Sequence, residues 1–122
     1  MGMKNKIADY LEKMEEKRRK LFEPFPDDER NIISEKTMKD FIDYVKAQPD
    51  DHVILRRMEK YQYDDEVYIP SAESEYELYK FMFSYPVEDF DSILSLIADL
   101  DFKQWFRAQN TYYGEKVAIH RA

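Results

Sequence analysis

The sequence is poor in the residues that build several common kinds of functional site. The chain of 122 residues contains no cysteine, two glycines and two histidines. The lack of cysteine excludes disulfide scaffolds, thiolate zinc sites and cysteine nucleophiles. Two histidines nearly exclude a multi-histidine metal centre, and two glycines leave no glycine-rich phosphate loop of the common kinds. We therefore expect no metal ion and no other cofactor.

Long hydrophobic runs are also absent, since none approaches the ~20 residues that a membrane-spanning helix needs. The N-terminal residues 1–6 are followed by an amphipathic stretch and not by the apolar segment of a secretory signal. No Asn-x-Ser/Thr glycosylation site occurs. These features predict a cytoplasmic protein that does not contact a membrane.

The composition is that of one folded domain. Nineteen basic and 26 acidic residues give a net charge of −7, and one Trp, ten Tyr and eight Phe make the chain rich in aromatic rings. Disordered chains are poor in such rings. Because we find no internal repeat, low-complexity tract or dividing linker, we expect a single domain over residues 1–122.

The first half predicts two amphipathic helices. Apolar residues from Lys4 to Phe22 recur at spacings of three, four and seven, and Pro24 and Pro26 then end the helix. Ser34 is a good N-cap for a second helix that Pro49 stops. Its apolar stripe consists of Met38, Phe41, Ile42 and Val45.

The pattern changes after His52 and favours strands. Residues 52–55 form a short run with two β-branched residues, and residues 60–69 are rich in Tyr and Val around an acidic turn. In residues 75–85, successive side chains would fall on alternate faces of a strand, one of them largely aromatic. A helix starting at Ser71 or Ser74 competes with the last of these strands, because Ser74-x-x-Glu77 fits a capping box. We favour the strand because nearly all alternate positions on one face are aromatic.

A third helix and a short last strand complete the expected fold. After Pro86 an apolar stripe follows acidic residues, which the helix dipole favours in a first turn. Residues 116–120 alternate again and suggest a strand. We therefore predict an α+β domain in which two N-terminal helices precede a small, mainly antiparallel sheet with the third helix packed on it.

Charge is unevenly distributed along the chain. Residues 1–22 carry seven basic and four acidic side chains, whereas residues 61–102 carry eleven acids, one base and ten of the nineteen aromatics. Tyrosine offers stiff contact area with a polar end, and surrounding acids steer a basic partner. The competing interpretation is that the rings form the core and the acids occupy solvated turns.

These observations favour a small, acidic, non-enzymatic protein-binding module that acts as an inhibitor, adaptor or regulator on a basic protein partner. A sharper hypothesis is an inhibitor that mimics phosphates in the groove of a nucleic-acid-acting enzyme, as many small phage proteins do. The candidate partner-binding residues are Tyr63, Asp64, Asp65, Glu66, Tyr68, Glu73, Glu75, Tyr76, Glu77, Tyr79 and Phe81.

Two other classes of function remain open, a nucleic-acid binder and an enzyme with an unfamiliar site. Four consecutive basic residues surround a helix rather than form one stripe, and the net charge of −7 opposes broad phosphate binding. The candidate nucleic-acid-binding residues are Lys17, Arg18, Arg19, Lys20, Arg56 and Arg57.

An enzyme would need His52 or His120 beside an acid as general base. Acidic groups at 64–66, 88–91 and 99–101 lack the glycine of a calcium loop and are explained as caps and turns. We therefore assign no catalytic residue and no metal ligand.

Overall fold

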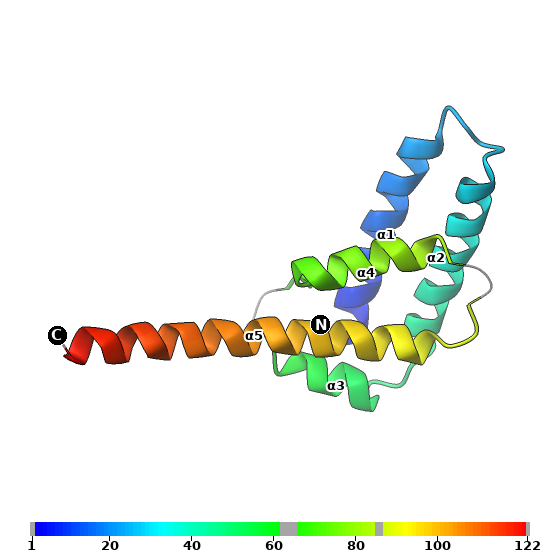
Figure 1. The fold of residues 1–122 in the computed structure, drawn as a ribbon. Coiled ribbons are helices and arrows are strands. Elements are labelled where there is room, and N and C mark those ends of the chain that lie inside the picture. The colour runs from blue at the N-terminus through cyan, green and yellow to red at the C-terminus, as the bar shows by residue number, and fades with distance from the viewer. Residues whose placement is uncertain (1, 62–65, 85–86, 122) are drawn as a thin grey trace.

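The structure is a computed structural model that describes residues 2–61, 66–84 and 87–121, with side chains up to residue 110. The described residues form five helices and no strand. They are α1 (Met3–Phe22), α2 (Glu29–Ala47), α3 (Val53–Glu59), α4 (Ala72–Met82) and α5 (Phe90–Arg121), shown in Figure 1.

The expected α+β fold is wrong, and the predicted strand 75–85, whose last residue Tyr85 lies outside the described residues, shows why. The aromatic alternation that favoured a strand coexists there with a helical pattern of buried residues at 74, 78, 81 and 82. The helix begins at Ser71, whose side chain accepts a hydrogen bond from the backbone N–H of Ser74. The capped helix satisfies its own backbone, whereas a strand here would need a neighbour that the chain does not supply.

The other predicted strands are also wrong wherever the structure describes them. Residues 53–59 form α3 because Leu55 and Met58, three positions apart, are buried together. The backbone of residues 116–120 continues α5. Of the predicted strand 60–69, residues 62–65 lie outside the described residues, and the remainder forms no strand. Short β-branched runs are weak strand signals because neighbours decide their conformation.

The predicted helices are confirmed, with changes at their ends. The first predicted helix corresponds to α1. The second begins earlier than predicted, at Glu29, with Asp28 as its N-cap. Ser34 lies inside α2, where its hydroxyl donates a hydrogen bond of 2.6 Å to the backbone carbonyl of Arg30. The third predicted helix begins at Phe90 and extends much further than its apolar stripe indicated.

Figure 1 shows α1 and α2 as an antiparallel hairpin, with α4 crossing it and α3 lying beside α5. Phe41 of α2 is at the centre of the core. Its ring lies 5.0 Å from that of Phe81 on α4 and 5.6 Å from that of Phe90 on α5, measured between centroids. One aromatic residue therefore ties three helices together. The rest of the core is mainly aliphatic and methionine-rich, and it also contains the buried ring of Tyr68.

A buried ion pair joins the hairpin near its tip. The guanidinium of Arg18, with its side chain 2% exposed, makes paired hydrogen bonds of 2.7 and 2.6 Å to the carboxylate of Glu15. It also donates to the side chain of Asn31 on α2 at 2.5 Å and to the hydroxyl of Ser34 at 3.2 Å. Because Arg18 of α1 binds side chains of α2 as well as Glu15, these hydrogen bonds hold α1 and α2 at a fixed distance.

The far part of α5 leaves the bundle and extends away from it (Figure 1). Before it does so, Arg107 lies 3.8 Å from Glu73 of α4. A helix of 32 residues is longer than the body on which it packs.

Replacement of Arg18 by Met should lower the free energy of unfolding by about 3–5 kcal/mol, because it leaves the Glu15 carboxylate buried without its partner. The matched control is Arg19→Met, since Arg19 lies 3.7 Å from the same carboxylate but is 72% exposed. Its cost should stay below about 0.5 kcal/mol. Urea denaturation measures both, and equal costs would show that the buried pair is unimportant.

Candidate partner-binding site

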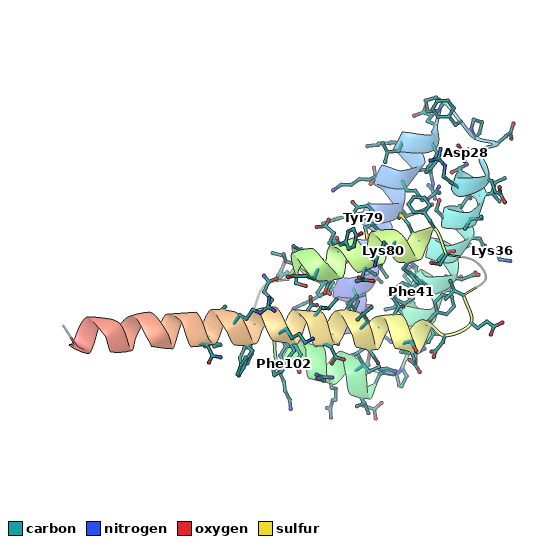
Figure 2. The ribbon with its side chains drawn as sticks, viewed as in Figure 1. Asp28, Lys36, Phe41, Tyr79, Lys80 and Phe102 are labelled. Carbon is teal, nitrogen blue, oxygen red and sulfur yellow. The ribbon has the colours of Figure 1, made fainter. Side chains whose placement is uncertain are left out.

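An open, largely apolar hollow lies between the C-terminal end of α1 and α4. Its volume is about 590 Å³, and we call it the α1/α4 groove. Figure 2 shows Tyr79 on α4, on the side that borders this groove. The groove is lined by Lys17, Arg18, Lys20, Leu21, Phe22, Tyr79, Met82 and Phe83.

The apolar lining of the groove is unusually exposed. Leu21 is 74%, Phe83 44% and Tyr79 39% exposed. The rings of Phe22 and Phe83 meet at 6.4 Å between centroids, which closes one end of the surface. Tyr76, 63% exposed, extends the same surface along α4, because positions 76, 79 and 83 share one helical face. Contiguous exposed apolar area of this kind marks interaction sites.

The charged groups in the groove lining are all basic. Lys17 has no ion-pair partner among the described residues, and Lys20 lies 3.6 Å from Glu16 in a pair in which both side chains are largely exposed. Arg18 is occupied by its buried contacts with Glu15. The charge that remains for a partner at this groove is therefore that of Lys17, with a contribution from Lys20.

Two of the three acids of α4 form ion pairs within the chain. Glu77 lies 3.0 Å from Lys80, and Glu73 lies 3.8 Å from Arg107. The ammonium group of Lys80 also lies 4.9 Å from the centroid of the Tyr76 ring. These contacts reduce the negative field that we expected around the tyrosines.

The structure separates the predicted partner-binding residues into three sets. Tyr76, Tyr79, Glu73 and Glu66 are exposed, and Glu77 and Glu75 are partly exposed. Tyr68 and Phe81 are buried, at 1% and 8% exposure, so neither can contact a partner in this fold. Tyr63, Asp64 and Asp65 lie outside the described residues.

Leu21, Phe22 and Phe83 line the groove but are not among the site residues that the sequence predicts. Leu21 and Phe22 are apolar residues at the end of the first predicted helix, so the periodicity places them in its last turn. Side chains in a last turn are covered only if another element extends that far, and here α4 covers Phe22 only in part. The spacing of positions 76, 79 and 83 would have revealed the exposed face if α4 had been predicted as a helix.

A buried carboxylate holds α4 in position. Asp101 of α5 is 6% exposed and accepts hydrogen bonds from the hydroxyl of Tyr68 at 2.5 Å, the backbone N–H of Ser71 at 2.9 Å and the hydroxyl of Ser74 at 2.7 Å. The two serines are the N-cap and the third residue of α4. This network joins the start of α4 to the middle of α5 and thereby positions Tyr76 and Tyr79.

The basic residues of the nucleic-acid hypothesis do not form one surface. Arg18 is buried. Lys17 and Lys20 lie at the C-terminal end of α1, whereas α3, which carries Arg56 and Arg57, packs at the N-terminal end of α1 beside Lys4. At 1.5 Å per residue, about 24 Å of helix separates Lys4 from Lys20. Arg57 also forms an ion pair with Asp99 at 2.8 Å.

One of the two histidines lies beside an acid. The Nε2 atom of His52 is 3.5 Å from the carboxylate of Asp91, and its buried Nδ1 atom has no hydrogen-bond partner among the described residues. The pair links the start of α3 to the first turn of α5. The side chain of His120 lies outside the described residues.

Neither the described residues nor comparisons with known proteins connect this site with a known function. No described helix is long and apolar enough to cross a bilayer, and no group of three potential metal ligands occurs among the described side chains. No protein family profile, curated protein or solved structure matches the chain.

The buried Tyr68 and the partly buried Tyr10 should make the protein sensitive to alkaline pH. Burial, reinforced by Asp101, raises the pKa of Tyr68 well above 10, and burial together with the Glu75 carboxylate raises that of Tyr10. Because the folded pKa values exceed the unfolded value near 10, the stabilisation is complete below pH 10 and is lost as pH rises further. Tyr68 should add a slope of about 1.4 kcal/mol per pH unit above pH 10. The slope from Tyr10 should be smaller, because its side chain is partly exposed and solvent screens its interactions.

Denaturation curves of Tyr10→Phe and Tyr68→Phe between pH 7 and 11 test this prediction. Both variants should show a shallower alkaline loss of stability. At pH 7 Tyr68→Phe should cost about 1.5–3 kcal/mol, since it removes a hydrogen bond to a carboxylate. Tyr10→Phe should cost less than Tyr68→Phe there, because the Tyr10 side chain is only partly buried. An unchanged alkaline slope in both variants would contradict the assignment.

Proposed function

We propose that the protein is a small, non-enzymatic protein-binding module whose α1/α4 groove seats an amphipathic helical segment of a partner. The observation that carries the proposal is the joined surface of Leu21, Phe83, Tyr79 and Tyr76, exposed on two helices that meet at an angle. An amphipathic helix places its apolar residues three and four positions apart, which suits a groove of this kind.

The charge of the groove selects the partner. An acidic group on the flank of the bound helix would meet Lys17, which lacks an ion-pair partner among the described residues. The same group would lie near Lys20 on the next turn of α1. A basic flank would bring like charges together in a partly desolvated place, which is unfavourable. The preferred occupant is therefore an apolar helix with acidic residues along the edge that faces α1.

This proposal keeps the class of function that the sequence favours and changes the binding chemistry. The tyrosines of α4 still supply the contact area, but the acids beside them are paired with Lys80 and Arg107. An acid-bearing segment replaces the basic partner as the preferred occupant. The proposal also keeps the cytoplasmic location that the sequence predicts. Phosphate mimicry, nucleic-acid binding and catalysis remain untested predictions without a supporting observation in the described residues.

A displayed library of amphipathic helices of about 16 residues, with a constant apolar face and randomised flanks, tests the proposal. Selection on the full chain should enrich sequences with Glu or Asp on one flank. Binding should weaken about tenfold or more with Lys17→Glu, because the charge that attracts the acidic flank is reversed. Fluorescence polarisation of a labelled selected peptide measures the dissociation constant.

Matched variants locate the binding surface. Leu21→Glu places a charge in the groove, and Val53→Glu places the same charge on α3, at a residue 81% exposed. We expect Leu21→Glu to abolish peptide binding and Val53→Glu to leave it unchanged. Selected peptides that lack an acidic flank, or that bind Leu21→Glu as well as the original chain, would refute the proposal.

A further inference from the structure

A regular stripe of exposed side chains runs along the solvent-facing side of α5. Its members recur at alternating spacings of four and three residues, so they follow one line along the helix. All are exposed, including two large apolar residues, Leu96 at 38% and Phe106 at 51%. The stripe consists of Ser92, Leu96, Asp99, Lys103, Phe106 and Asn110.

The stripe is complementary to itself when it is reversed about Asp101. Asp99 and Lys103 lie two residues on either side of this centre, and Leu96 and Phe106 lie five residues on either side. A second copy of α5 laid antiparallel would therefore place each Asp99 opposite a Lys103 and each Leu96 opposite a Phe106. An isologous two-fold interface has this property, because the same patch must match itself.

We propose that the exposed stripe of α5 binds the same stripe of a second copy, giving an antiparallel two-fold dimer. Lys103 has no ion-pair partner among the described residues, and it would gain Asp99 of the second copy. Asp99 is 52% exposed and holds Arg57 through one carboxylate oxygen at 2.8 Å, so its other oxygen is free to accept a second cation. Two apolar contacts flank the two ion pairs.

The course of α5 supports the same partner. The C-terminal part of α5 extends away from its own bundle (Figure 1), and a single helix in water is only marginally stable without packing. In the antiparallel arrangement about Asp101, the backbone of residues 108–112 would run along residues 90–94, the first turn of the partner's α5, and the residues after them would continue past the start of that helix. A shallow hollow of about 360 Å³, lined in part by Val87, Ser92 and Leu96, lies at that end of the helix. The projecting helix of each copy would thus be covered by the body of the other.

The contact is one helix wide, so the dimer should be weak. Stable dimers bury roughly 800 Å² on each partner, and one helical stripe supplies less unless the projecting helix also packs. We therefore expect a dissociation constant in about the micromolar range, with a dependence on salt that comes from the paired charges.

Charge reversal on the full chain tests the proposal by sedimentation equilibrium. The original protein should pass from 14.9 kDa towards twice that mass as its concentration rises. Lys103→Glu places Glu opposite Asp99, and Asp99→Lys places Lys opposite Lys103, so each variant by itself should associate about tenfold more weakly or worse. An equimolar mixture of the two variants should dimerise again, because both opposed pairs are then of opposite charge.

Controls separate this interface from other effects. Lys13→Glu makes the same change of charge as Lys103→Glu at an exposed residue of α1 and should leave the dimer intact. Leu21→Glu, in the α1/α4 groove, should also leave it intact, so the failure of one proposal does not decide the other. Asp99→Lys loses the pair with Arg57, and circular dichroism verifies its fold. Phe106→Glu provides a second disruption that leaves that pair in place.

Three outcomes would overturn the proposal. The first is an original chain that stays monomeric up to about 1 mM, well above the expected dissociation constant. The second is a Lys103→Glu variant that associates as well as the original chain. The third is a mixture of the two charge variants that remains monomeric although each variant is folded.

Discussion

The carboxylate of Asp101 is the constraint on which both proposed surfaces depend. It receives hydrogen bonds from Tyr68, from the N-cap of α4 and from Ser74, so one buried anion holds the preceding loop, α4 and α5 together. Burial of an anion without such donors would be costly, which makes the three contacts a joint requirement of the fold. With α4 in this position, Tyr76 and Tyr79 face outward beside α1. The opposite side of α5 remains free for its exposed stripe.

The hairpin of α1 and α2 supplies the other wall of the groove through a second buried charge. Arg18 is bound by Glu15 and Asn31 and therefore contributes no charge to the surface, although three basic residues adjoin it in the sequence. Its neighbours Lys17 and Lys20 remain at the groove. The fold thus divides the run of four basic residues into the structural cation Arg18, Arg19 beside Glu15, and two cations at the groove.

The ion pairs within the chain determine which charged side chains remain available to select a partner. The chain has a net charge of −7, yet Glu73 and Glu77 on the exposed side of α4 are each paired with a base of the same chain. Lys17 and Lys103 have no ion-pair partner among the described residues, and each lies beside exposed apolar side chains. An unpaired charge next to apolar area can discriminate between partners, because a wrong partner leaves that charge desolvated and unmatched.

The sequence by itself determined the lack of thiolate chemistry and the helices over 4–22, after Ser34 and after Pro86, since their apolar stripes repeat at the period of a helix and prolines separate them. It could not decide the segment 75–85, where an alternating and a helical pattern overlap and the hydrogen bonds of Ser71 and Asp101 choose the helix. Only the tertiary structure decided that Tyr68 and Phe81 are buried while Tyr79 is exposed. The physical reason is that exposure depends on which other helix covers a side chain, and that is settled by contacts between residues far apart in the chain, such as those of Asp101 with Ser71 and Tyr68.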